Sequence, residues 1–287
     1  IGWGIVWDVA YVGALGRKLP YGLALNTAPP GTGAAGRILF QKFGRTANII
    51  ERGYGVNNNY NSLQTNFRKR MGNGLMFTVA YTYGKGMGVG GDEGGGGQTG
   101  FMNNFNIPWH YAPLNYDRTH LLVASHLYEL PIGEGKRWLD QKGLLGLIFG
   151  NWQLNGIFRS YTGTPFTITA DSTPCNCPGN SVTADVLKPC KILGGVGPGQ
   201  KWFDITAFAQ PGPNRWGTAG RNILRGPGIV YYDMSVFKNF PVKEHMKIEF
   251  RAEFFNLTNT PQFGGPATSI TSATFGEISS ASGQRNI

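Results

Sequence analysis

Hydrophobic and polar residues alternate with a period of two in several separate stretches of the chain. The clearest stretch sets one row of charged residues against one row of apolar residues: Lys247, Glu249, Arg251 and Glu253 against Ile248, Phe250, Ala252 and Phe254. Successive side chains of a strand point to opposite faces, so this stretch predicts a strand with one charged and one apolar face. The same alternation predicts strands over residues 4–12, 59–70, 75–84, 118–129, 151–161, 230–240 and 246–256. Helical periodicity is nearly absent, with one short turn expected around 138–142, so the pattern predicts an all-β fold.

The connections between these strands alternate between short and long. The segment "MGNG" (71–74) predicts a tight hairpin turn, and the connection at 240–246 is also short. Most of the others are long and rich in Gly, Pro and Asn, over 13–58, 85–117, 162–229 and 257–284, with one of medium length at 130–150. Loops longer than about 15 residues are uncommon in compact soluble domains. Outer-membrane barrels, in contrast, combine short periplasmic turns with long extracellular loops.

The strand lengths favour the same interpretation. A membrane-spanning strand needs about 9–11 residues, and most of the expected strands are close to that length. The sequence therefore predicts an antiparallel, meandering outer-membrane β-barrel, present as an open segment of about seven or eight strands. Its apolar face would meet lipid and its polar face the lumen.

The polar residues that alternate with the apolar ones along the expected strands are the candidate lumen-facing residues. They are Gln64, Asn66, Arg68, Gln153, Asn155, Arg159, Asp233, Ser235, Lys247, Glu249, Arg251 and Glu253. Charged pairs across neighbouring strands would each contribute roughly 0.2–1 kcal/mol. These residues would either solvate the lumen and brace a plug, or contact a passing ligand. Ligand capture is expected from the long loops, where binding residues concentrate.

Composition limits the alternatives. Charged residues make up only 15% of the 287 residues, and the longest apolar run, "LLGLIFG" (144–150), is far too short for a membrane helix. The net charge of +10 suggests an anionic partner, but basic residues cluster only in "NFRKRMG" (66–72). Because no basic helix or zinc-finger spacing accompanies that cluster, we expect no nucleic-acid partner.

The cysteines are few and close together. Cys175, Cys177 and Cys190 lie within one loop, and no His or further Cys nearby completes a metal site. We expect one disulfide among them and one spare thiol, in an oxidising compartment, with the pairing left open.

No pattern of catalytic residues stands out. The segment "GMGVGG" (86–91) fits a dinucleotide-binding spacing, but no helix follows it. Asp92 and Glu93 lack the spacing of a calcium loop, and the histidines are scattered. We therefore expect no enzyme, no metal and no cofactor.

Four segments, in order, carry a resemblance to a known family. They are "YNSLQTNFRKRMGNGLMFTVAYTYGKG" (60–86), "DRTHLLVASHLYELPIGEGKRW" (117–138), "GNWQLNGIFRSYTGTPFTI" (150–168) and "FRAEFFNLTNTPQFGGP" (250–266). Together they resemble the C-terminal barrel of TonB-dependent outer-membrane receptors, in particular the Oar-like group with a carboxypeptidase-regulatory-like front domain. The resemblance implies a 22-stranded barrel, an N-terminal plug and uptake of an unidentified solute. It also implies a location in the outer membrane of a Gram-negative-type bacterium, with membrane lipid and an inner-membrane energy-coupling complex as partners.

The ends of the sequence suggest a partial barrel. The chain begins at Ile1 inside a strand-like pattern, shows no plug or coupling box, and stops at "GQRNI". We expect a single partial barrel domain over 1–287, without plug or final strand, in which 4–12 and 246–256 do not pair. One alternative is a self-contained small barrel, a passive pore or structural protein, in which those two segments do pair. The other is a secreted β-sandwich adhesin whose apolar faces turn inward.

Overall fold

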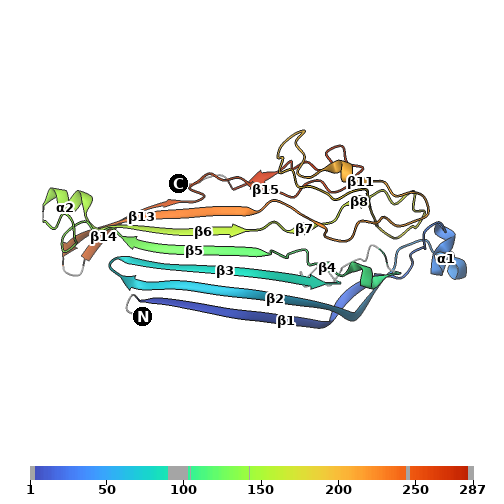
Figure 1. The fold of residues 1–287 in the computed structure, drawn as a ribbon, viewed down its shortest axis with the longest axis horizontal. Coiled ribbons are helices and arrows are strands. Elements are labelled where there is room, and N and C mark those ends of the chain that lie inside the picture. The colour runs from blue at the N-terminus through green and yellow to red at the C-terminus, as the bar shows by residue number, and fades with distance from the viewer. Residues whose placement is uncertain (1–3, 90–102, 104, 142, 244–245, 284–287) are drawn as a thin grey trace.

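A computed structural model describes residues 4–89, 103, 105–141, 143–243 and 246–283. Its main element is an eight-stranded antiparallel sheet in which neighbours in sequence are neighbours in space (Figure 1). The strands, in spatial order, are β1 (Ile5–Ala24), β2 (Ile50–Gly72), β3 (Leu75–Gly88), β5 (His120–Glu129), β6 (Trp152–Tyr161), β13 (Ile229–Lys243) and β14 (Met246–Phe254), with β4 (Ala112–Pro113) paired to β3. The expected antiparallel meander is confirmed.

The sheet is open. β1 and β14 are its outer strands, and in the described chain they pair with β2 and β13 and not with each other. The other sheets of the described residues have two strands each, so no second layer faces the large sheet as in a sandwich. The expectation of an open sheet is confirmed, and the sandwich alternative is wrong.

Strands β1 and β2 are much longer than the alternation predicted. They have 20 and 23 residues, so the connection expected at 13–58 is reduced to 25–49. Gly16, Lys18 and Pro20 break the alternation, but the backbone pairing continues past them through an irregularity between Gly16 and Leu19. There the side chain of Asn58 accepts a hydrogen bond from Gly16 N at 3.1 Å. The pairing therefore extends through sequence that lacks a strand pattern.

Two short α-helices lie in the connections, α1 (Ile38–Phe43) and α2 (Leu144–Phe149). The helical turn expected around 138–142 is wrong, because Trp138 instead forms a β-bridge with Ile132 and α2 begins further along. In the described part of the chain, no helix has the length and apolar character needed to cross a membrane.

The connections differ at the two ends of the sheet (Figure 1). At one end lie the short β2–β3 and β13–β14 connections and the β5–β6 connection that contains α2. The β2–β3 turn is the expected hairpin, with positive φ angles at both Asn73 and Gly74. The long connections gather at the opposite end, together with α1. The glycine-rich stretch 90–100, with Asp92 and Glu93, lies outside the described residues.

The long connections pack against one another, and we call residues 25–49, 103, 105–119, 162–228 and 255–283 the loop cluster. Its buried apolar centre comprises Ile168, Ala184, Phe203, Ala207, Phe208 and Phe275. Its short elements are β7 (Pro165–Phe166), β8 (Thr169–Ala170), β9 (Val182–Thr183), β10 (Asp185–Val186), β11 (Phe208–Ala209), β12 (Leu224–Arg225), β15 (Gln262–Phe263) and β16 (Ala281–Ser282), and 3₁₀ turns at Ala34–Gly36, Ile107–His110 and Ile205–Ala207. Sequence that was expected to be open loop therefore contains a folded core.

Candidate functional site

The strand register defines two faces of the sheet, because residues opposite each other in an antiparallel pair share a face. Glu253 lies opposite Ser235, and Ser235 lies opposite Asn155. Followed strand by strand, the register places every candidate lumen residue on one face, which we call the polar face. They are Gln64, Asn66, Arg68, Gln153, Asn155, Arg159, Asp233, Ser235, Lys247, Glu249, Arg251 and Glu253.

The opposite face, here the apolar face, collects large hydrophobic residues from all seven long strands. They include Trp7, Val9, Tyr11, Leu63, Phe67, Val79, Tyr81, Leu122, Leu154, Phe158, Val230, Tyr232, Met234, Val236, Phe240, Ile248, Phe250 and Phe254. On β13 this row runs from Val230 to Phe240, with the buried Lys238 as its one charged member, and is about 33 Å long at roughly 3.3 Å per residue. With a tilt of about 40°, that length spans roughly the 25 Å apolar band of an outer-membrane barrel.

Apolar side chains on this face are open to the surroundings. Trp7 is 69% exposed, Tyr11 72% and Ile248 61%. A contiguous apolar surface of this kind is unusual on a water-soluble monomer and marks contact with a protein or a membrane.

A hollow of about 440 Å³ lies over β3, β5, β6, β13 and β14, and most of its lining residues belong to the polar face. Arg159 and Asp233 face each other there, with Nη1 and Oδ2 3.8 Å apart. Asn155 Nδ2 donates to Ser235 Oγ at 3.4 Å, and Glu253 completes this side of the hollow. The sequence-predicted residues of β6, β13 and β14 thus come together into one polar surface that can contact a solute by hydrogen bonds and charge.

Charges along β14 interact mainly within the strand. The Arg251 guanidinium is 3.0 Å from Glu249 Oε1 and 3.8 Å from Glu253 Oε1, and it lies 4.3 Å from the centre of the Phe237 ring. These groups are about half exposed, so the pairs contribute little to stability. Their arrangement keeps both signs of charge along the polar face.

The candidates on β2 are separate from the hollow. Gln64 Nε2 donates to Ser62 Oγ at 3.2 Å, and Arg68 lies 3.8 Å from Asp8 on β1. The lining of the hollow reaches Met76, Phe77 and Thr78 on β3 and, among the described residues, includes none on β2. The β2 residues therefore form a second polar region on the same face.

Sequence reasoning missed the residues that connect the loop cluster to the sheet. Arg221 donates through Nε to His110 O at 3.0 Å and through Nη2 to Gly88 O, at the end of β3, at 2.9 Å. Arg225 forms an ion pair with the buried Asp117. These residues lie in "RNILR" (221–225), where no alternation or motif separates a buried arginine from a solvated one.

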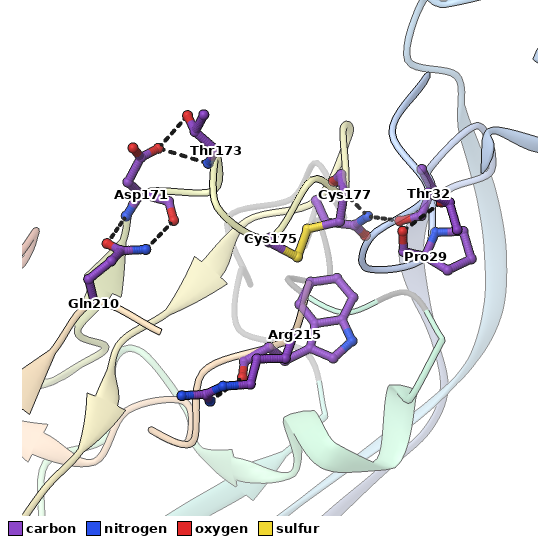
Figure 2. Close-up of a disulfide and its surroundings, with 11 residues drawn as sticks. Pro29, Thr32, Asp171, Thr173, Cys175, Cys177, Gln210 and Arg215 are labelled. Carbon is purple, nitrogen blue, oxygen red and sulfur yellow. Dashed lines mark hydrogen bonds between the residues drawn. A yellow bond between two sulfur atoms is a disulfide. The ribbon is translucent and has the colours of Figure 1, made fainter. Parts of the chain in front are cut away.

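The disulfide joins Cys175 and Cys177 (Figure 2). Cys190 is a free thiol. Both bonded cysteines are buried, and the loop they close lies against the β1–β2 connection. Gly31 N donates to Cys175 O, and Gly33 N donates to Asn176 O, each at 2.9 Å. The disulfide loop therefore contributes to the contact between two long connections.

Charged groups of the loop cluster are held by specific partners. The hydrogen bond from Arg215 holds the pKa of Asp185 below its usual range. Lys188 and Thr206 lower the pKa of Asp204 to about 2. Burial lowers the pKa of His110 from 6.5 to about 4, and burial raises the pKa of the Cys190 thiol. In the described residues, no group of His, Cys, Asp and Glu could hold a metal ion.

The sequence matches the family described as "Outer membrane beta barrel domain" over residues 1–287. The chain belongs to this family. The sheet is thus a segment of outer-membrane barrel, which agrees with its open antiparallel meander and with a location in the outer membrane. No curated protein and no solved structure matches the chain.

Proposed function

We propose that this barrel segment forms part of the wall of a TonB-dependent outer-membrane receptor that takes up a solute. The observation that carries the proposal is the separation of the two faces by the strand register. The apolar face contacts lipid, and the polar face lines the lumen. The segments that resemble such receptors coincide with the β2–β3 hairpin, β5, β6 and the end of β14.

The loop cluster is the proposed outer surface of the receptor. It lies at the end of the sheet opposite the short turns, and in barrels of this kind long loops are extracellular. Arg221 and Arg225 fix it to the ends of the strands and to the loops beside them, so it is a folded cover and not a set of free loops. A solute would meet this surface first and the hollow on the polar face afterwards.

The open edges support a larger barrel over a self-contained pore. In a bilayer each unpaired backbone group costs several kcal/mol, so the outer edges of β1 and β14 need partner strands. A self-contained pore would pair these two strands directly, and they are not paired. We propose that further strands of the same receptor pair with them. An inner-membrane energy-coupling complex would then act through an N-terminal region, with no nucleic acid and no catalytic step involved.

Cysteine labelling of two neighbouring residues on β13 tests the proposal without knowledge of the solute. Ser235→Cys places a thiol on the polar face, and the matched control Met234→Cys places one on the apolar face. Both are made with Cys190→Ser, which removes the free thiol and leaves the disulfide intact. A charged maleimide added to cells should label position 235 and not position 234.

Energy dependence separates the receptor from a passive pore. Dissipating the proton-motive force, or deleting the coupling complex, should change the labelling rate at position 235 several-fold if a plug is moved by that complex. Rapid labelling that does not depend on energy supports a passive pore. Labelling at position 234 and protection at 235 would overturn the assignment of the faces.

A further inference from the structure

The helix α2 is almost entirely apolar and almost entirely exposed. Its large side chains are 48–76% exposed, at Leu144, Leu145, Leu147, Ile148 and Phe149. Trp138, in the same β5–β6 connection, is 57% exposed. We call these six residues the α2 patch. It is separate from the long strands, so the alternation that explains the apolar face of the sheet does not account for it.

Two side chains of the apolar face hold the end of α2. Trp152 Nε1 donates to Ile148 O at 3.0 Å. Lys238 Nζ donates to Gly150 O, the residue that follows the helix. Trp152 and Lys238 lie opposite each other in the β6–β13 pair and share the apolar face. The connection is therefore fixed from the lipid side of the sheet and not from its polar face.

The buried lysine marks the depth of this attachment. Lys238 is 2% exposed, and its ammonium lies 5.2 Å from the ring centres of both Trp152 and Phe240. A charged ammonium is costly within the hydrocarbon layer, and tryptophan is enriched at the boundary between lipid and water. The end of α2 therefore lies at the level where the apolar band ends.

We infer that the α2 patch inserts into the phospholipid layer beside the short-turn end of the barrel, at the boundary between head groups and acyl chains. The patch continues the lipid-facing surface past the ends of β5 and β6. Arg137 is exposed beside it, with its guanidinium carbon 5.8 Å from the centre of the Trp138 ring, where it can meet lipid phosphates. A plug in the lumen would lie on the other face. This inference rests on the assignment of the faces proposed above.

Depth-dependent fluorescence quenching tests the inference in the protein reconstituted into phospholipid bilayers. An environment-sensitive dye is attached at Leu147→Cys, in the Cys190→Ser background. Leu187→Cys is the matched control, because Leu187 is also a highly exposed leucine but lies in the loop cluster. We expect lipids that carry a quencher near the head group to quench position 147 several-fold more than position 187. Quenchers at the end of the acyl chain should act less on position 147.

Two further labels make the outcome decisive. Leu144 is 76% exposed, so Leu144→Cys disturbs little packing and provides a second reading if Leu147→Cys folds poorly. Met234→Cys reports the face of the sheet itself. Quenching at 234 without quenching at 144 or 147 overturns this inference and leaves the proposed function standing. Absence of quenching at all three positions overturns the assignment of the faces as well.

Discussion

Phe203 and Phe250 illustrate how differently the two parts of this molecule are built. Phe203, in the loop cluster, is fully buried, whereas Phe250, on the apolar face of β14, is 52% exposed. The same contrast holds for the buried hydrophobic residues as a group, which lie mostly in the loop cluster: Ala28, Ala112, Leu114, Ile168, Cys175, Cys177, Val182, Ala184, Phe203, Ala207, Phe208, Ala219, Phe275 and Ile278. The hydrophobic core of the described chain thus lies in the loop cluster and not on the long sheet.

The loop cluster and the sheet bury their hydrophobic residues differently because different surroundings contact them. The loop cluster must exclude water by its own packing, so its aromatic side chains face one another and its polar backbone groups are bonded to Arg221 and Asn222. Under the proposed assignment of the faces, the sheet needs no second layer, because lipid would cover one face and lumen contents the other. A domain whose sheet has few buried hydrophobic residues can therefore carry an ordinary core in its loops.

Removing the Phe203 side chain should cause the largest loss of stability, and the loss should be confined to the loop cluster. Its ring centre lies 5.4–5.9 Å from those of Phe166, Phe208 and Phe275. Phe203→Ala should therefore lower the stability of the loop cluster by about 3–5 kcal/mol, while the sheet stays inserted. Hydrogen exchange of residues 162–228 would show this loss. The control Phe250→Ala should leave exchange in these loops unchanged, and an equal effect of both variants would contradict the separation of the two parts.

Adding a charge to the sheet should have the next largest effect, and the effect should depend on the face. Met234→Arg places the charge on the apolar face near the middle of β13, at a cost of about 2–4 kcal/mol for a lipid-facing position. Ser235→Arg, one residue along on the polar face, should cost far less. Reversible folding of the whole receptor, whose further strands pair with β1 and β14, into phospholipid bilayers in urea measures both. A larger loss for Ser235→Arg would reverse the assignment of the faces.

The sheet could be predicted because alternation is a local signal. Most long strands follow the pattern of their apolar and polar residues, and five of the predicted polar residues line the hollow. Strand β5 is an exception, because its apolar residues Leu121, Val123 and Leu127 lie on the polar face. The extra length of β1 could not be predicted, because Gly16, Lys18 and Pro20 carry no period and the pairing is maintained by Asn57 and Asn58. Backbone pairing with a neighbour is not a property of one segment alone.

The loop cluster and α2 could not be predicted for related reasons. Arg221 and Asp117 acquire their roles only when segments far apart in sequence meet. The run "LLGLIFG" was recognised as apolar, but its short length and lack of helical period gave no sign of a helix or of its exposure. Lys238 interrupts an apolar row, and only the structure shows that its ammonium bonds the Gly150 carbonyl.

Breaking the disulfide should destabilise the loop cluster less than the Phe203 substitution does. The bond between Cys175 and Cys177 closes a loop of very few residues, so the chain-entropy gain is only on the order of 1–2 kcal/mol. The double variant Cys175→Ser, Cys177→Ser should loosen the contact with Gly31 and Gly33 and speed proteolysis within 25–49. Cys190→Ser is the control and should change nothing. Complete loss of the folded loop cluster would mean that the disulfide does more than position this contact.

Mild acid should cause the smallest loss of stability, and this loss should be confined to the loop cluster. Because burial lowers the pKa of His110 from 6.5 to about 4, the unfolded chain binds a proton between those values that the folded cluster does not. The contribution of neutral His110 to stability is therefore complete above pH 6.5 and declines as the pH falls toward 4.

Asp185 and Asp204, whose pKa values are lowered, lose their contribution only below their ordinary pKa of 3.8, outside this window. One proton changes the folding equilibrium by at most tenfold per pH unit, so hydrogen exchange at 103–119 should rise by less than tenfold between pH 6.5 and 5.5, after correction for intrinsic exchange rates. His110→Gln, which cannot titrate, should abolish this dependence, and persistence of the full dependence in that variant would assign it to another group.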